Sequence, residues 1–284
     1  MSALKDSPFF PDWDYVIITA SNARQAKAYR DQIELRESLG FIRGVKRVLV
    51  IADPGGLRVG SGGSTVHCLL RVLNLELGDQ GGRPGRSDPG SWTRILDRLR
   101  ILIVHAGGDS RRLPPYGPCG KIFVPVPGGS GGALGTTLFD RLMPIYLRLP
   151  RPWSGGGQVV VASGDVLLDF DAASVAFAEK GVTGIGAIVS PDLAKNHGVY
   201  CREEDGGVRL FLQKPSPAKQ EALGAVNAHG QTVLDIGILN FAPGAAVRLL
   251  ELCGVRKNGP EGSPFRWSGP VSRAIEAAGL DVYR

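Results

Sequence analysis

The residues best suited to chemistry lie in one glycine-rich segment that follows a strand-like apolar stretch. Gly107 and Gly108 let the backbone approach a phosphate closely and offer N–H donors. Arg111 and Arg112 follow them, and each guanidinium group can bind phosphate oxygens through two parallel hydrogen bonds. Lys121 then adds a compact positive charge. This pattern predicts a site for a phosphorylated ligand, and the alternative is a surface turn with solvated arginines.

Two common phosphate-binding motifs do not fit this chain. A P-loop needs a glycine five residues before its Gly-Lys pair and a serine or threonine after it, but Pro115 and Ile122 stand at those positions. The glycine-rich stretch 60–65 fails the dinucleotide-binding fingerprint, because its sixth residue, Thr65, is neither glycine nor alanine. The phosphate site is therefore predicted to be of another type.

An acidic residue, Asp165, follows a second strand-like stretch, Val159–Ser163. A carboxylate just past the end of a core strand is well placed to hold a magnesium ion that bridges phosphates. A Gly-Asp turn alone is weak evidence, but its expected position at the same sheet edge as Lys121 favours a metal site. We therefore predict Mg²⁺ as the cofactor and Asp165 as its ligand.

Further polar residues lie around a predicted hairpin in the second half of the chain. His197 precedes the hairpin and Lys214 stands at its far end, just before a proline that stops the strand. Lys214 can neutralise a substrate phosphate or simply be solvated. Asp235 and Asn240 flank a later apolar strand, where they could bind sugar hydroxyls, provide a second metal contact or face solvent.

The elements that must position these residues alternate along the chain. Apolar β-branched runs predict strands over Tyr15–Thr19, Val45–Ala52, Ile101–His105, Val159–Ser163 and Gly186–Ser190, then a hairpin of Val199–Glu203 and Val208–Leu212. Helices are predicted from the capping residue Asn22 to about Leu39 and over Val66–Leu77, and residues 78–92 have the composition of a flexible loop. The alternation predicts an α/β fold: a Rossmann-like mixed, mostly parallel sheet with helices on both faces, and a small β-hairpin substrate lobe. Ligands bind beyond the carboxyl ends of the strands in such sheets, which is where the residues above are expected.

The composition fits a globular protein with small anionic ligands. The 284 residues are 43% apolar and 21% charged, which excludes a disordered or fibrous chain and suits one large domain or two fused lobes. The net charge of +6 comes from scattered basic residues without interleaved aromatics, so nucleic acid is not expected as a partner, and the oligomeric state is left open. Apolar runs are only strand-sized and no secretory signal is visible, so we expect a cytoplasmic location without a membrane partner.

The four cysteines are far apart and show no zinc-ligand spacing, so reduced thiols are expected. Cys119 lies among the residues of interest, and a packed apolar role is predicted for it.

Together, these motifs resemble the sugar-phosphate nucleotidyltransferases. The shared order is Ala-Gly-Gly-x-x-x-Arg-Leu, then a lysine, then Gly-Asp, then a hairpin that ends in Lys-Pro. The closer similarity is to the GDP-fucose pyrophosphorylase (fucose-1-phosphate guanylyltransferase) family, which includes the N-terminal part of bifunctional L-fucokinase/GDP-fucose pyrophosphorylases. It covers roughly residues 14–284 and is carried by Ile18-Thr-Ala-Ser-Asn, Asp53-Pro-Gly-Gly, Gly60-Ser-Gly-Gly-Ser-Thr-Val-His, His105-Ala-Gly-Gly-Asp-Ser-Arg-Arg-Leu-Pro, Gly120-Lys-Ile-Phe and Phe211-Leu-Gln-Lys-Pro-Ser.

The resemblance implies an enzyme that joins GTP and fucose-1-phosphate into GDP-fucose and pyrophosphate with Mg²⁺. It assigns the nucleotide phosphates to a loop of Gly107, Gly108, Asp109, Ser110 and Arg111, with Arg112 as the loop's arginine. It also assigns Lys121 to the reacting phosphates, Asp165 to the metal and Lys214 to the sugar phosphate. The expected catalytic residues are therefore Arg112, Lys121 and Asp165. The expected substrate-binding residues are Lys214, Asp235, His197, Gly62 and Gly63.

Two departures from the wider superfamily bear on these roles. That superfamily has a third glycine and a threonine where this chain has Ser110 and Arg111, so the loop geometry does not transfer unchanged. The loop also lies far from the N-terminus, behind a predicted glycine turn at 60–63 that either binds phosphate or sugar ahead of its helix or serves only tight packing.

The alternatives are the same chemistry on another nucleoside triphosphate or sugar-1-phosphate, or a non-catalytic nucleotide-binding fragment of a bifunctional enzyme. Residues 1–284 are expected to form one nucleotidyltransferase domain, with an N-terminal α/β segment over 1–100 and the binding core over 101–284. A kinase domain and a β-helix are not expected in this stretch, which looks cut inside or just after the catalytic domain.

Overall fold

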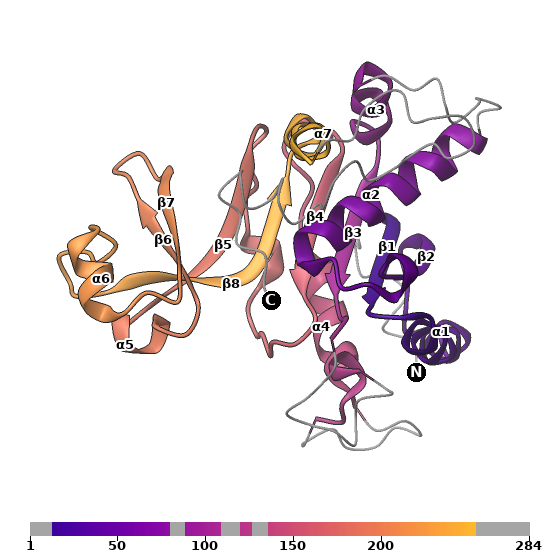
Figure 1. Ribbon diagram of the computed structural model, residues 1–284, viewed down its shortest axis with the longest axis horizontal. Coiled ribbons are helices and arrows are strands. Elements are labelled where there is room, and N and C mark those ends of the chain that lie inside the picture. Colours follow the sequence, from indigo (N-terminus) through magenta and orange to yellow (C-terminus); the bar gives the residue numbers. More distant parts are fainter. Residues whose placement is uncertain (1–12, 80–88, 109–119, 127–135, 254–284) are drawn as a thin grey trace, which may run out of the picture. The chain divides into compact units, whose positions relative to one another are not determined.

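The computed structural model describes residues 13–79, 89–108, 120–126 and 136–253 (Figure 1). Contacts divide the chain into two units: Met1–Val182 with Asn240–Arg284, and Thr183–Leu239. Each unit is described separately below. The predicted division into segments 1–100 and 101–284 stays a prediction.

Four parallel strands form the centre of the first unit. They are β1 (Trp13–Ala20), β2 (Val45–Ala52), β3 (Arg100–His105) and β4 (Gln158–Ser163), in the order β2-β1-β3-β4. In this register Ile17 of β1 lies between Leu49 of β2 and Ile103 of β3. Such strands are rich in β-branched residues because a parallel sheet is covered on both faces. Since all four run the same way, their carboxyl ends lie at one edge of the sheet.

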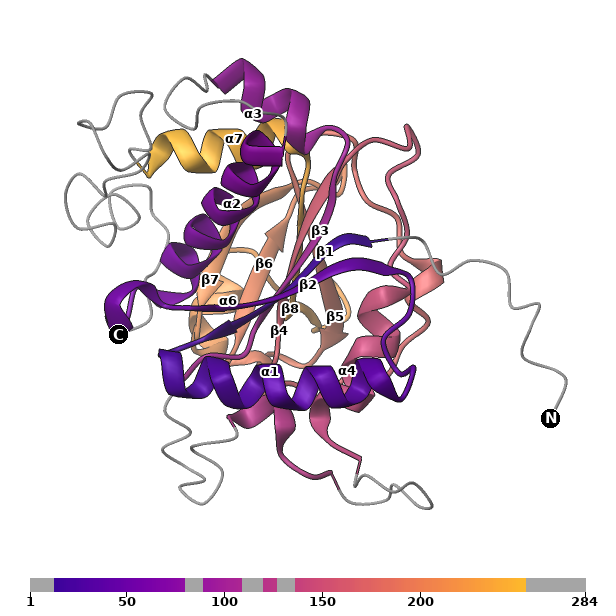
Figure 2. The ribbon, with the colours of Figure 1, turned by 90° about the vertical axis from the view of Figure 1, so that its right-hand side faces the viewer.

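Helices cover both faces of these strands (Figure 2). On one face lie α2 (Gly60–Asp79), α3 (Pro89–Leu96) and α7 (Pro243–Leu252). Side chains alternate between the faces of a strand, and Tyr15, Ile17 and Ile103 share a buried cluster with residues of these helices, namely Leu69, Leu73, Trp92, Leu96 and Leu250. The opposite face is covered by α1 (Ala23–Ser38) and α4 (Leu138–Leu147).

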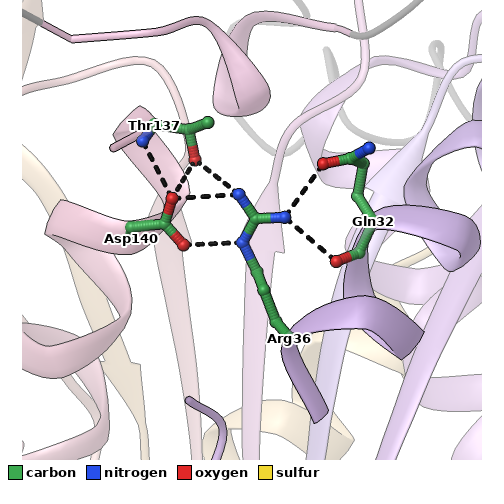
Figure 3. Close-up of polar contacts among 4 residues, drawn as sticks. All are labelled: Gln32, Arg36, Thr137 and Asp140. Atoms are coloured by element: carbon green, nitrogen blue, oxygen red, sulfur yellow. Dashed lines mark hydrogen bonds and ion pairs between the residues drawn. The ribbon is translucent and has the colours of Figure 1, made fainter. Parts of the chain in front are cut away.

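A buried ion pair joins the two helices of that opposite face (Figure 3). Arg36 of α1 donates to Asp140 of α4 from Nε at 2.6 Å and from Nη2 at 2.9 Å. The Arg36 side chain is only 1% exposed. Its guanidinium group lies 5.1 Å from the ring centre of Phe123 in η4 (Lys121–Phe123) and 5.5 Å from that of Phe139 in α4. The pair therefore links α1, α4 and the short η4 turn.

The second unit is built mainly from antiparallel strands. Its elements are β5 (Val182–Val189), α5 (Pro191–Ala194), β6 (Gly198–Arg202), β7 (Val208–Gln213), α6 (Pro217–Ala222) and β8 (Thr232–Phe241). Strand β6 pairs antiparallel with β7 and with β8, and β5 pairs with β8. A small core of its own contains Ala194, Val199, Cys201, Leu212 and Ala225. The first residue of β5 and the last two of β8 belong to the first unit.

The predicted fold class, a mixed and mostly parallel α/β sheet with a β-hairpin, is confirmed. The hairpin forms around Asp205-Gly-Gly, where Gly206 adopts a φ of +89° that favours glycine. Asn22 caps α1, since its side chain accepts a hydrogen bond from the N–H of Gln25 at 3.0 Å.

Three predicted boundaries are wrong. Helix α2 already begins at Gly60, so the glycines at 60–63 lie in its first turn. The first N–H groups of a helix have no intrahelical partner. The residues that follow, Ser64 and Thr65, are buried and help to hold the helix in place. α3 begins at Pro89, inside the predicted loop 78–92, because proline is tolerated at a helix start and Trp92 is buried. Strand β5 starts at Val182 rather than Gly186.

Two further observations concern the expected absence of membrane-spanning helices and the expected reduced thiols. Across the part of the chain that the structure describes, every helix is too short or too polar to cross a bilayer. Cys68, Cys201 and Cys253 are buried free thiols, and Cys119 lies outside the described residues.

Candidate active site

The two glycines after β3 lie against the end of β1. The Thr19 hydroxyl oxygen accepts the N–H of Ala106 at 3.1 Å and, more weakly, that of Gly107 at 3.4 Å. A Cβ atom on Gly107 would lie 3.2 Å from the Ser21 nitrogen, so the turn packs closely on the neighbouring backbone. Gly108 has a φ of +139°, which residues with a side chain rarely adopt. Both glycines are therefore explained by the backbone path of this turn.

Lys121 and Asp165 meet at the same edge of the sheet. Lys121 Nζ lies 2.8 Å from Asp165 Oδ2, and the Ser163 hydroxyl donates to Asp165 Oδ1 at 2.8 Å. The Gly164 N–H donates to the carbonyl of His105 at 2.9 Å, so the turn that carries Asp165 lies directly beside the end of β3. The residues predicted to share one edge are brought together here, although their catalytic roles stay predictions.

The electrostatics of Asp165 keep it ionised. Partial burial would raise its pKa, but hydrogen bonds from Lys121 and Ser163 and the charge of Lys121 lower the pKa below its ordinary value. The two side chains are about half exposed, at 42% for Lys121 and 46% for Asp165. A half-exposed, ionised pair of this kind can receive a charged ligand.

A second group of polar residues lies where β2 ends and α2 begins. The N–H of Asp53 donates to the carbonyl of Ala20 at 2.8 Å, and the Thr65 hydroxyl lies 2.9 Å from His105 Nε2. Burial raises the pKa of Asp53 to about 6, against the opposing effects of a hydrogen bond from Ser64, the charge of Arg58 and an N–H bond from Val59. Burial also lowers the pKa of His105 to about 4.

Gly62 and Gly63 lie in the first turn of this helix α2, and Gly63 is buried. The helix start thus lies near the end of β3 through the contact between Thr65 and His105. Whether the two glycines bind substrate stays a prediction.

In the second unit, Lys214 has an unusual backbone. Its φ of +48° lies in the left-handed region, and among the described residues no other non-glycine residue does so. The Lys214 N–H donates to the carbonyl of His197 at 2.9 Å, which holds these two predicted substrate residues side by side. Such strain is found at functional positions, where the surrounding structure enforces it.

Asp235 and Asn240 occupy different surroundings along β8. Asp235 Oδ1 accepts from the Tyr200 hydroxyl at 2.9 Å and from the N–H of Gly237 at 2.8 Å. Asn240 belongs to the first unit and is fully buried, so the alternative that it faces solvent is wrong. Neither polar atom of its side chain has a hydrogen-bond partner among the described residues.

Some residues lie outside this description, and others were missed by the sequence analysis. Asp109, Ser110, Arg111 and Arg112 are outside the described residues. The missed residues are Thr19, Gln25 and Tyr29, which contact the turn after β3. The apolar face of the first helix includes Tyr29, but that pattern alone does not reveal which strand end its hydroxyl meets.

Comparison with known proteins shows which family the chain belongs to. A family model described as the fucose pyrophosphorylase domain matches residues 93–275. The chain belongs to the fucose pyrophosphorylase family. The matched range includes Lys121, Asp165 and Lys214, so the resemblance stated from the motifs is confirmed.

Curated relatives in this family are longer than the chain. It is 29% identical over 249 residues to the bifunctional fucokinase/GDP-fucose pyrophosphorylase of Arabidopsis thaliana, covering 81% of the chain and 23% of that protein. It is 33% identical over 192 residues to the L-fucokinase/L-fucose-1-P guanylyltransferase of Bacteroides fragilis, covering 66% and 19%. The fucose-1-phosphate guanylyltransferase of Mus musculus is 28% identical over 248 residues, covering 81% and 38%. The chain thus spans less than two fifths of the length of these relatives.

Proposed function

We propose that this chain joins GTP and fucose-1-phosphate, giving GDP-fucose and pyrophosphate. The observation that carries the proposal is the Lys121–Asp165 pair at 2.8 Å, set beside the Gly107–Gly108 turn at the carboxyl ends of parallel strands. This is where ligands bind in open α/β sheets. Support also comes from the names of the relatives, two of which combine a fucose activity with guanylyl transfer or GDP-fucose formation.

The proposed reaction is an in-line displacement at phosphorus. An oxygen of the sugar-1-phosphate forms a bond to the α-phosphorus of GTP, the bond from that phosphorus to the bridging oxygen breaks, and pyrophosphate leaves with the electron pair. The nucleophile is already an anion, so the reaction needs no strong base. Its barrier comes from bringing two polyanions together and from charge on the leaving group. Lys121 and Arg112 would neutralise that charge.

The residues at this edge fit a magnesium ion. Magnesium prefers oxygen ligands, and Asp165 offers an ionised, half-exposed carboxylate. A bound Mg²⁺ would supply charge neutralisation on the phosphates.

Lys214 would bind the phosphate of the sugar. Its strained φ of +48° and its bond to the His197 carbonyl hold the ammonium-bearing residue at one end of the hairpin. Strain of this kind is consistent with a position selected for function.

The test is pyrophosphate release with GTP, fucose-1-phosphate and magnesium. Lys121→Ala and Arg112→Ala should each lower kcat by a factor on the order of 10²–10³, because each removes a cation that acts on the transition state. Lys214→Ala should mainly raise KM for the sugar phosphate. The matched control is Lys27→Ala, which breaks an exposed ion pair of the same 2.8 Å length with Asp31 on α1 and should leave both constants unchanged. Near-normal turnover in all three site variants of an active protein would refute the mechanism.

The two alternatives give different results in a wider panel. Release with another nucleoside triphosphate or sugar-1-phosphate would identify a different substrate for the same chemistry. GTP binding without pyrophosphate release under any condition would instead identify a non-catalytic nucleotide-binding module. A cytoplasmic location remains part of the proposal, and cell fractionation tests it.

A further inference from the structure

Two residues on the buried face of α1 hold the backbone of the turn after β3. The Tyr29 hydroxyl donates to the carbonyl of Ala106 at 2.8 Å, and Tyr29 is fully buried. One turn earlier, Gln25 Nε2 donates to the carbonyl of Gly108 at 3.2 Å. The other end of the Gln25 amide accepts from the N–H and the hydroxyl of Ser21, both at 2.8 Å. The path of the glycine turn is thus set from one helix face.

Tyr29 also contacts the segment that carries Lys121. Gly120, with a φ of +65°, packs so closely on Tyr29 that a Cβ atom there would overlap the phenolic oxygen. The Tyr29 ring meets the Phe123 ring edge-on, with centres 5.2 Å apart. One side chain therefore touches both the glycine turn and the two ends of the Gly120–Phe123 segment.

We propose that Tyr29 is a positioning residue, assisted by Gln25, that fixes Lys121 relative to the Gly107–Gly108 turn. This inference rests on the proposed function, because the distance between Lys121 and the Gly107–Gly108 turn affects the rate only if both bind the reacting phosphates. Lys121 itself is 42% exposed, so its own side chain makes little packing that could fix it. The rigid contacts lie one residue earlier, at Gly120, and two residues later, at Phe123.

The Tyr29 hydroxyl is a hydrogen-bond donor to the buried carbonyl of Ala106 at the turn. Without that hydrogen bond the Ala106 carbonyl must find water or move, since a buried acceptor left unpaired is costly. Either change alters the glycine turn while the ring of residue 29 still packs on Phe123. The turn and Lys121 then lose their fixed separation, and small misplacements of reacting groups reduce rates strongly.

Tyr29→Phe is the direct test, since it deletes only the hydroxyl. We expect kcat for pyrophosphate release to fall on the order of 10- to 100-fold with KM values nearly unchanged. Hydrogen exchange measured by mass spectrometry should speed up in peptides that cover residues 105–108 and 120–123. The matched control is Tyr15→Phe, which deletes the hydroxyl of another buried tyrosine, bonded to Glu76 at 2.7 Å near the start of β1. It should lose similar stability yet keep kcat and the exchange of both segments.

A double-mutant comparison separates positioning from general weakening of the fold. If Tyr29 acts by fixing the separation between the turn and Lys121, then adding Tyr29→Phe to Lys121→Ala should lower kcat by less than a factor of about two. A full multiplicative loss in the double variant would overturn the inference, as would unchanged kcat and exchange in Tyr29→Phe alone. If Tyr29→Phe does not fold, Gln25→Met provides the second variant, with the same expected loss of kcat and faster exchange at 105–108.

The exchange measurement also separates this inference from the proposed function. A wild-type protein that releases no pyrophosphate with any substrate would refute the proposed function. The Tyr29→Phe exchange would still decide whether the hydroxyl couples the two segments. An active wild-type protein with an unaffected Tyr29→Phe variant would refute the positioning role alone.

Discussion

The buried pair of Arg36 and Asp140 offers a sharp test of how the face opposite α2 is held (Figure 3). Asp140→Asn keeps the shape of the side chain and removes its charge. Arg36, at 1% exposure, would then keep a guanidinium group without its carboxylate. The Thr137 hydroxyl at 3.2 Å and the Gln32 carbonyl at 3.0 Å would remain as neutral acceptors.

The expected loss can be worked out from the bonds involved. Arg36 gives two charge-assisted hydrogen bonds to Asp140, at 2.6 and 2.9 Å, and removing one member of a buried pair costs about 3–5 kcal/mol. Asp140 is 24% exposed, so solvent already weakens the pair, and the asparagine oxygen can keep one bond. We therefore expect Asp140→Asn to lower the free energy of unfolding by about 3 kcal/mol, at the lower end of that range.

The assay is urea unfolding at pH 7, with a second variant that removes both charges. Arg36→Met with Asp140→Asn should be more stable than Asp140→Asn alone, because no charge is left buried without a partner. The hydrogen bonds of Arg36 and Thr137 lower the pKa of Asp140 in spite of its burial. Its contribution is therefore complete above the unfolded pKa of 3.8 and is lost only as the pH falls through the lower folded value. A loss below about 1 kcal/mol for Asp140→Asn, as for an exposed pair, would refute the reasoning.

Two further predictions concern Asp53 and Lys214. The folded pKa of Asp53, about 6, lies above its ordinary 3.8, so its protonation stabilises the fold fully below 3.8 and this gain is lost as the pH rises through 6. Asp53→Asn should flatten the fall in Tm between pH 4 and 7, and an unchanged slope would contradict the raised pKa. Lys214→Gly should stabilise the protein by up to about 1 kcal/mol in urea unfolding, since glycine adopts the φ of +48° without strain. Lys214→Ala keeps the strain and serves as its control, and equal stability of the two variants would contradict the prediction.

The sequence predicts the sheet and one edge of the site well, for a simple physical reason. Parallel strands are rich in β-branched residues, and Val45–Ala52 is found with the predicted bounds. Because parallel strands end at a common edge, the order of motifs predicts that Asp165 lies beside the end of β3. Lys121 lies in the later η4 turn, and its position also depends on the packing of Tyr29 against Gly120 and Phe123.

Contacts that cross between helices and turns could not be predicted in the same way. Tyr29 and Ala106 are separated by 77 positions, and Arg36 and Asp140 by 104. From the sequence alone, an arginine in a helix is predicted to be exposed. Arg36 is buried because the carboxylate of Asp140, on a helix far away in the sequence, pairs with it. Glycine weakens helices on average, yet the glycines at 60–63 lie in the first turn of α2, directly before the buried Ser64 and Thr65.

Exposure separates the two kinds of ion pair in the first unit. Lys121 and Asp165 are about half exposed, so their pairing contributes at most about 1 kcal/mol to the fold. An incoming phosphate can therefore compete for Lys121 at little cost to stability. Arg36 has no such freedom, because its guanidinium group is buried against the stacked rings of Phe123 and Phe139 and is held by Asp140. The buried pair contacts the η4 turn through Phe123, and we propose that the exposed pair at the start of that turn exchanges partners with a ligand.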